Sequence, residues 1–85
     1  MEKKIVLYTT AYCPYCHRAL KRLDDKKVTY QNIDVSNNRE AFKKIMDQTG
    51  WDTVPQIFID GEFIGGCDDL LALDAQGKLD EKLGV

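Results

Sequence analysis

Two cysteines, Cys13 and Cys16, have the spacing in this 85-residue sequence that points most directly to chemistry. They stand three positions apart in the tetrapeptide Cys-Pro-Tyr-Cys, and Pro14 favours the first turn of a helix at that point. Residues i and i+3 of a helix are neighbours, so the two sulfur atoms can form and break a disulfide after a small adjustment. The pair therefore predicts reversible thiol–disulfide chemistry.

Three other uses of the pair have to be weighed. A zinc site needs about four protein ligands, and Cys67 and His17 are the remaining Cys and His residues of the chain. The run from Cys13 to His17 also matches the Cys-x-x-Cys-His pattern of covalent haem attachment, which takes place outside the cytosol. Two packed, inert cysteines are the third alternative, and the exposed position expected for Cys13 argues against it.

The two sulfur atoms are predicted to differ in environment. Cys16 shares an apolar stripe with Ala19, Leu20 and Leu23 at helical spacing, so its side chain should point inward. Cys13 precedes the stripe, where unpaired N–H groups and the positive end of the helix dipole stabilise a thiolate. We therefore expect Cys13 to be the nucleophile and Cys16 the resolving thiol.

The elements that position this pair follow from the pattern of apolar residues. Residues 4–9 are a short run rich in β-branched and aromatic residues, which predicts a buried strand. A helix follows from Pro14, with Lys26 at its end, where a cation complements the helix dipole. Residues 28–35 predict a second strand, parallel to the first because a strand–helix–strand crossover joins them.

A second helix is expected after this crossover. Ser36, Asn37 and Asn38 are its candidate capping residues, and Asn37 and Glu40 have the spacing of a capping box. Gly50 fits the position just past its C-terminus.

The next segment predicts a tight antiparallel hairpin. Residues 56–59 and 62–65 are apolar runs that flank Asp60-Gly61, a dipeptide typical of two-residue hairpin turns. This hairpin supplies the third and fourth strands.

The C-terminal part of the chain predicts one more helix. Asp68 is expected to cap it and Gly77 to close it, and Leu79 and Leu83 anchor a final helical turn or two in residues 78–85. The whole chain then has the order β-α-β-α-β-β-α around one mixed sheet of four strands, which is an α/β fold.

Composition limits the classes of function. The length allows one domain over residues 1–85. Twelve basic and fourteen acidic side chains give a net charge of −2, which argues against nucleic acid as a partner. No apolar run approaches the roughly 18–20 residues of a membrane helix, and the N-terminal apolar stretch is too short for a signal peptide. We expect a cytoplasmic monomer that does not associate with membranes, and the odd cysteine count argues against a structural disulfide framework.

Three motifs in order give the sequence a family resemblance. They are Cys13–Cys16 after a strand, Thr53-Val54-Pro55 before a strand, and the Gly-Gly-Cys-Asp-Asp run of residues 65–69 after a hairpin. Together they resemble the dithiol glutaredoxins, and the bacterial glutaredoxin-three type in particular, over residues 3–83. The resemblance implies a thioredoxin-like fold.

The resemblance also implies roles for individual residues. Cys13 would attack the sulfur of a glutathione mixed disulfide, and Cys16 would resolve intramolecular intermediates. Pro55 would be a cis-proline facing the active site, and Val54 would lend its backbone groups to the cysteinyl part of glutathione. The glutathione-binding positions implied in this way are Tyr15, Thr53, Val54, Pro55, Gly66, Cys67 and Asp68.

Plain structural roles remain open for several of these positions. Tyr15 could be an exposed aromatic residue, residues 53–55 an ordinary start of a strand, and Asp68 a helix cap. Cys67 could be a packed spectator thiol or a site of glutathionylation. Trp51, just before the Thr-Val-Pro motif, either lines the ligand groove or covers the core.

Two positions depart from the family pattern. Thr10 stands where many members carry Lys or Arg, so stabilisation of the thiolate falls on the helix terminus and on local N–H groups. Asp52 stands where many members carry Arg. Recognition of the glycine carboxylate of glutathione would then depend on Arg39, Lys43 or Lys44, which could equally form a solvated helix face.

The resemblance implies a glutathione-dependent thiol–disulfide oxidoreductase with glutathione as co-substrate, no tightly bound cofactor and no metal site. Its substrates would be glutathionylated or disulfide-containing proteins, with ribonucleotide reductase as an acceptor on family grounds. Its redox potential would be about −200 to −230 mV. One alternative is a related enzyme served by thioredoxin reductase. Another is a protein that holds a [2Fe–2S] cluster between two chains through Cys13 and two glutathiones, which Pro14 disfavours.

Overall fold

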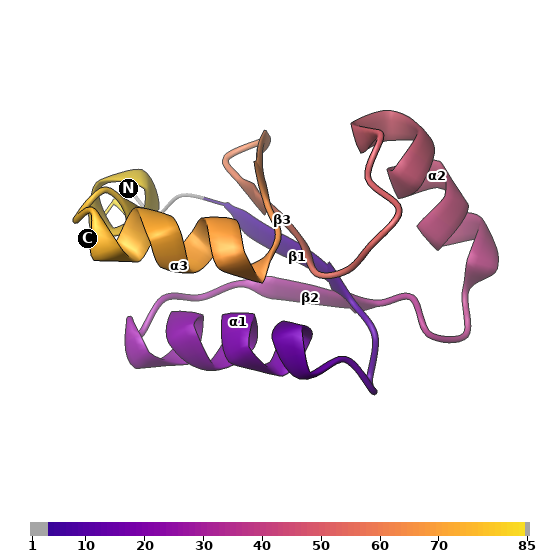
Figure 1. Ribbon diagram of the computed structural model, residues 1–85, viewed down its shortest axis with the longest axis horizontal. Coiled ribbons are helices and arrows are strands. Elements are labelled where there is room, and N and C mark those ends of the chain that lie inside the picture. Colours follow the sequence, from indigo (N-terminus) through magenta and orange to yellow (C-terminus); the bar gives the residue numbers. More distant parts are fainter. Residues whose placement is uncertain (1–3, 85) are drawn as a thin grey trace.

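One four-stranded mixed sheet organises residues 4–84, the part of the chain that the computed structural model describes (Figure 1). Its strands are β1 (Ile5–Thr9), β2 (Gln31–Asp34), β3 (Gln56–Ile59) and β4 (Glu62–Gly65), in the order β2-β1-β3-β4. β1 runs parallel to β2 and antiparallel to β3, and β3 and β4 form the antiparallel hairpin. The predicted mixed sheet is confirmed.

Four helices accompany the sheet: α1 (Pro14–Asp25), α2 (Arg39–Thr49), α3 (Cys67–Ala75) and α4 (Leu79–Leu83). α1 and α3 lie side by side, and α2 stands apart from them at the other end of the molecule (Figure 1). The order β-α-β-α-β-β-α is confirmed, and α4 is the final helical turn expected in residues 78–85. No helix within residues 4–84 has the length and apolar character that crossing a membrane requires.

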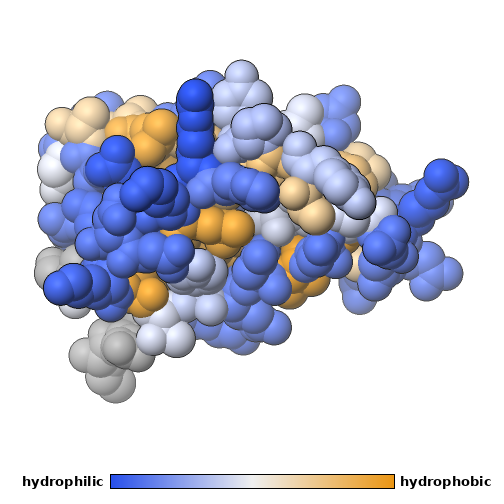
Figure 2. Space-filling model, turned by 90° about the horizontal axis from the view of Figure 1, so that it is seen from below, coloured by the Kyte–Doolittle hydropathy of each residue, from blue (hydrophilic) through white to orange (hydrophobic). Residues whose placement is uncertain are grey.

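The hydrophobic core lies between the sheet and the three helices α1, α3 and α4. Ile5 and Leu7 of β1 point into it, while Val6 and Tyr8 alternate toward the opposite face and stay half-exposed. The other core residues are Ala19, Leu23, Ile57, Ile59, Cys67, Leu70, Leu79 and Leu83. The outer surface on the α1 side is mostly hydrophilic (Figure 2), as the amphipathic pattern of that helix predicts.

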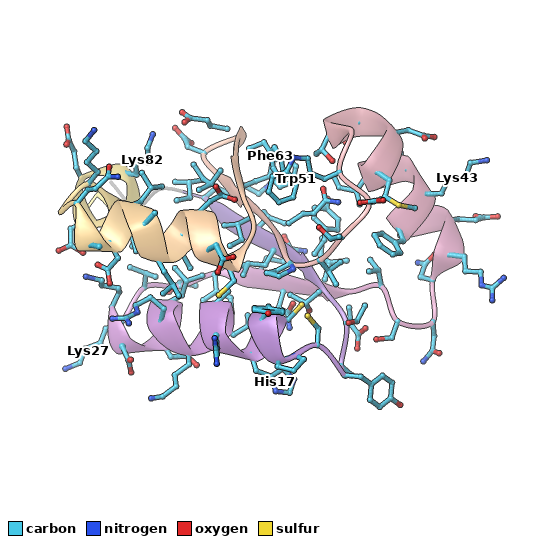
Figure 3. The ribbon with its side chains drawn as sticks, in the orientation of Figure 1. His17, Lys27, Lys43, Trp51, Phe63 and Lys82 are labelled. Atoms are coloured by element: carbon cyan, nitrogen blue, oxygen red, sulfur yellow. The ribbon has the colours of Figure 1, made fainter. Side chains whose placement is uncertain are left out.

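An aromatic cluster occupies the opposite face of the sheet. Tyr8 packs edge-on against Phe58, with ring centroids 5.8 Å apart. Phe63 lies 5.2 Å from Phe58 and 5.2 Å from Trp51, and the contact between Trp51 and Phe63 is visible in Figure 3. Trp51 belongs to the loop between α2 and β3, so this cluster ties that loop to the sheet.

The turn residues have the backbone conformations that their types predict. Asp60 and Gly61, at the tip of the hairpin, have positive φ values of 53° and 84°, as a type I′ turn requires. Gly50 closes α2 in the left-handed conformation at φ 77°, and its N–H donates to the carbonyl of Met46.

Two of the predicted boundaries near β2 and α2 are wrong. Asn38, not Asn37, caps α2, because its Oδ1 accepts the N–H of Ala41 at 3.0 Å, so the expected capping box from Asn37 to Glu40 does not form. β2 covers only residues 31–34 of the predicted 28–35. Gln31 already pairs with Val6 near the start of β1, so residues 28–30 approach the sheet as a loop.

The start of α3 also differs from the prediction. Gly66 is the capping residue and the helix begins at Cys67, so Asp68 lies in the first turn and is not the cap. Asp69 provides the missing acceptor: its Oδ2 accepts the N–H of Gly66 at 3.0 Å. Gly65 precedes this junction with a φ of 123°, a backbone angle that residues other than glycine rarely adopt.

Candidate active site

Cys13 occupies the capping position at the N-terminus of α1, where its side chain is half-buried. Its own N–H reaches the carbonyl of Thr10 at 3.5 Å, and its carbonyl accepts the N–H of His17 at 3.2 Å. The loop that leads to it is held by Ser36, whose hydroxyl oxygen accepts the N–H of Ala11 at 2.9 Å. The thiol therefore sits at the end of the helix where free N–H groups converge.

Cys16 lies one turn further along the same helix and is completely buried. Burial, more than any other cause, raises the pKa of its thiol from 9.0 to about 12, and a hydrogen bond with Cys13 adds to the rise. A hydrogen bond from the backbone of Thr10 acts in the opposite direction. The two cysteines are unlinked, and Cys16 is a neutral thiol at physiological pH.

The Thr-Val-Pro segment faces Cys13 from the loop before β3. The peptide bond between Val54 and Pro55 is cis, as the resemblance implies. The Sγ of Cys13 donates to the carbonyl oxygen of Val54 at 3.7 Å, across 41 positions of sequence. The fold therefore brings the first two of the three motifs into contact.

A groove of about 290 Å³ lies next to this contact, and it collects the third motif as well. All seven positions expected to bind glutathione line it: Tyr15, Thr53, Val54, Pro55, Gly66, Cys67 and Asp68. Trp51 lines it too, as one of its two expected positions requires. Its ring also packs on Phe63 of the sheet. Asp69 is a lining residue that sequence reasoning did not single out, and its signal was the acidic residue three positions after a helix cap.

Glycine at position 66 lets the two walls of this groove approach closely. A Cβ atom there would lie 3.2 Å from the ring of Trp51, a tight contact, and 3.4 Å from the carbonyl oxygen of Pro55. A side chain at this position would therefore require the ring of Trp51 to shift by a few tenths of an ångström.

The third cysteine and the histidine lie outside this chemistry. Cys67 is buried, and burial raises the pKa of its thiol, so it is poorly placed for glutathionylation. His17 is exposed, and its Nε2 donates to the carbonyl of Ala11 at 3.0 Å. Within residues 4–84, no three His, Cys, Asp or Glu side chains are grouped so that they could hold a metal ion.

The basic residues considered for the glycine carboxylate lie elsewhere. Arg39, Lys43 and Lys44 are exposed on α2 and do not line the groove. Lys43 projects from α2 away from the rest of the molecule (Figure 3). Asp52 is exposed beside Trp51 and does not line the groove either.

These features define a class of protein. One cysteine lies at the N-terminus of a helix, a buried thiol lies one turn further along, and a loop with a cis-proline faces the first cysteine on a thioredoxin-like sheet. This arrangement is that of a thiol–disulfide oxidoreductase.

Comparison with known proteins identifies the family. The profile of the family described as Glutaredoxin matches residues 5–64. The chain is 48% identical over 79 residues to Glutaredoxin 3 of Escherichia coli K12, covering 93% of this chain and 95% of that protein. It is 51% identical over 81 residues to Glutaredoxin 1 of Rickettsia prowazekii, covering 93% and 85%.

A solved structure supports the same assignment. The crystal structure of a buckwheat glutaredoxin–glutathione complex superposes with a TM-score of 0.91 at 33% identity, covering 96% of this chain and 77% of that one. The chain belongs to the glutaredoxin family, and it is a thiol–disulfide oxidoreductase.

Proposed function

We propose that this glutaredoxin uses glutathione to reduce glutathione mixed disulfides and protein disulfides, with Cys13 as nucleophile and Cys16 as resolving thiol. The observation that carries the proposal is the convergence of all seven expected glutathione-binding residues on one groove beside the Sγ of Cys13. The buckwheat relative, solved as a complex with glutathione, adds support.

The groove offers partners for the cysteinyl and γ-glutamyl parts of the tripeptide. The backbone of Val54 pairs with the cysteinyl residue in the manner of an added strand and directs its sulfur to Cys13. The N-terminal N–H groups of α3, at Cys67 and Asp68, receive the carboxylate of the γ-glutamyl end. The exposed carboxylate of Asp68 faces the ammonium group of the same end, and Tyr15 packs beside the ligand.

The monothiol cycle requires Cys13 alone. The Cys13 thiolate attacks the glutathione sulfur of a mixed disulfide, the bond between the two substrate sulfurs breaks, and the client leaves as a thiolate that takes a proton. A second glutathione, as thiolate, then attacks the enzyme-bound glutathione sulfur, releasing oxidised glutathione and the Cys13 thiolate. The sum is one mixed disulfide and one glutathione converted to one free thiol and one glutathione disulfide.

The dithiol cycle also uses Cys16. The Cys13 thiolate attacks one sulfur of a client disulfide, whose S–S bond breaks and releases the other client sulfur as a thiolate that takes a proton. Cys16 then loses its proton and attacks the Cys13 sulfur, which releases the second client thiol and leaves a Cys13–Cys16 disulfide. Two glutathione molecules reduce this disulfide and leave as one glutathione disulfide. Disulfide-containing proteins, including ribonucleotide reductase, are the proposed acceptors. Because burial raises the pKa of Cys16, little of this thiol is ionised near neutral pH before Cys13 has reacted.

Steady-state reduction of a glutathione mixed disulfide, coupled to glutathione reductase and NADPH, tests the proposal on three proteins. Cys13→Ser should be inactive, Cys16→Ser should retain substantial turnover, and the wild type should be active. Wild-type protein that is inactive with glutathione but accepts electrons from thioredoxin reductase would show that the glutathione site is assigned wrongly. Activity of Cys13→Ser would overturn the choice of nucleophile.

A further inference from the structure

The side chain of Gln56 is a completely buried amide at the first position of β3, directly after Pro55. A buried amide group must have its donors and acceptor hydrogen-bonded. An unpaired N–H or carbonyl in the core has lost its hydrogen bonds to water and gains none in return. Gln56 pairs with Tyr8 of β1 through the backbone, so its position along the sheet is fixed. Its side chain lies on the face opposite to Ile57.

All of the polar atoms of this amide are engaged by the end of α2 and the loop that follows. Its Nε2 donates to the carbonyl of Trp51 at 2.9 Å and to the carbonyl of Thr53 at 3.1 Å. Its Oε1 lies 2.8 Å from the hydroxyl oxygen of Thr49, whose single proton it shares with the carbonyl of Ile45 at 3.0 Å. Carbonyl oxygens only accept, so this orientation of the amide is the one that satisfies all three partners.

Thr49 closes the arrangement from the last turn of α2. Its hydroxyl oxygen also accepts the N–H of Trp51 at 3.1 Å, so both backbone groups of Trp51 are held, one by Thr49 and one by Gln56. The two carbonyls that Gln56 holds flank the segment leading to Val54, whose own carbonyl meets the Sγ of Cys13 at 3.7 Å.

We infer that Gln56 is a positioning residue for substrate: by holding the carbonyls of Trp51 and Thr53, it fixes the loop of residues 51–55 so that the backbone of Val54 faces Cys13. Gln56 itself does not line the groove. The inference rests on the proposed glutathione function, because it assigns the purpose of the loop to binding the tripeptide.

A purely structural role for Gln56 makes a different prediction. If the amide only stabilised the fold, its loss would lower the folded fraction and hence the apparent kcat, and the KM of the remaining folded enzyme would not change. If it positions the loop, the KM for the glutathione mixed disulfide rises while kcat changes little, because binding to Val54 is made in the ground state and the transition state alike. Trp51 is the only tryptophan in the sequence, so its emission reports the loop directly.

Gln56→Glu is the decisive variant because it keeps the size of the side chain and replaces the amide donor that serves the two carbonyls. Gln31→Glu makes the same chemical change on the exposed strand β2 and is the matched control. We expect Gln56→Glu to raise the KM by about tenfold, with kcat within twofold of wild type and a shifted Trp51 emission. Gln31→Glu should leave all three unchanged. A KM within twofold of wild type in folded Gln56→Glu would overturn the inference.

Two further measurements keep the test decisive. If Gln56→Glu does not fold, Thr49→Val, which removes the hydroxyl that orients Gln56, should raise the KM, and Thr49→Ser should restore it; equal KM values for these two variants would overturn the inference. If wild-type protein is inactive with glutathione, the proposed function fails. The positioning of the loop is then decided by Trp51 emission alone, which must shift in Gln56→Glu and not in Gln31→Glu.

Discussion

Three positions along one helix separate two thiols with opposite surroundings. Cys13, at the capping position, is half-buried and touches the carbonyl of Val54, whereas Cys16 is completely buried, like Ala19 and Leu23 of the same helix. Helical phase creates this difference, because position 13 precedes the buried stripe and position 16 belongs to it. This difference is the physical basis of the proposed roles, in which the accessible sulfur meets the substrate and the buried sulfur acts on its neighbour.

The raised pKa of Cys16 predicts a loss of stability at alkaline pH. In the unfolded chain this thiol loses its proton near pH 9.0, and in the folded protein it keeps the proton up to about pH 12. Between these values the unfolded state binds fewer protons than the folded state, so the free energy of unfolding falls as pH rises. At pH 10 the loss from this group is about 1 kcal/mol relative to neutral pH. Urea unfolding of the reduced protein at pH 7.5 and pH 10 measures it.

Cys16→Ala is the comparison that isolates this group. All other titratable side chains are the same in both proteins, so the difference between the two alkaline losses reports the presence of the Cys16 thiol. We expect the variant to lose less stability than the wild type between the two pH values, although it is less stable at both because it lacks a buried side chain. Equal alkaline losses in the two proteins would show that the Cys16 thiol is not protected from ionisation.

Individual site residues could be predicted where a motif fixed their chemistry. Cys13 and Cys16 were expected from their spacing and the cis Val54–Pro55 bond from the family resemblance, and the structure has them in contact or one turn apart. Gln56 was not singled out, because its three partners come from separate positions that meet only when α2, the loop and β3 pack together. Sequence patterns report local structural preferences and do not report tertiary hydrogen bonds of this kind.

At the scale of elements, the junction between β4 and α3 shapes one wall of the groove. Gly65 takes a φ of 123°, and a Cβ atom there would collide with the carboxylate of Asp69. The carboxylate occupies that space in order to accept the N–H of Gly66, which starts the helix whose first turn lines the groove. The carboxylate of Asp69 therefore needs a glycine at position 65 in order to reach the N–H of Gly66.

Asp69→Ala should weaken both the fold and the groove. It leaves the N–H of Gly66 without its acceptor, which costs about 1 kcal/mol of stability. It also loosens the wall next to Trp51, and we expect the KM for a glutathione mixed disulfide to rise several-fold. Asp69→Asn keeps an oxygen that can accept the same N–H and should lie close to wild type in both. Urea unfolding and steady-state kinetics on the three proteins decide, and an Asp69→Ala variant matching wild type in both would refute this role.

The elements themselves were largely predictable, and some of their ends were not. The apolar run of β1, the Asp60-Gly61 turn and the amphipathic stripe of α1 are local signals that tertiary packing reinforces. The N-terminal caps were predicted only in part: Asn38 was one of three candidates for α2, whereas the cap expected at Asp68 is Gly66. The direction in which the chain arrives decides among them, selecting Asn38 for α2 and Gly66 with Asp69 for α3.

At the scale of the whole molecule, function and stability occupy different ends. The groove and Cys13 lie where α1 and α3 begin, and α4 packs beyond the far end of α3. Charges join the helices there: Lys26 Nζ lies 2.8 Å from both Asp74 and Asp80, and Arg22 lies 3.1 Å from Asp74. The aspartates raise the pKa of Lys26, chiefly through its hydrogen bond to Asp74. This network links the end of α1 to α3 and to α4, whose leucines are buried.

Leu79→Ala tests whether this distant end supports the fold without shaping the site. Leu79 is fully buried and joins α4 to the core, so truncation should cost roughly 2–5 kcal/mol, a large share of the roughly 5–15 kcal/mol that holds a typical domain together. The half-buried Leu71 of α3 is the control, and Leu71→Ala should cost clearly less. Because Leu79 does not line the groove, the KM of folded Leu79→Ala for a glutathione mixed disulfide should equal that of wild type. Urea unfolding measures the first effect and kinetics well below the unfolding transition the second. A stability loss no larger than that of Leu71→Ala would show that α4 is dispensable to the core, and a raised KM would show that core and groove are coupled through α3.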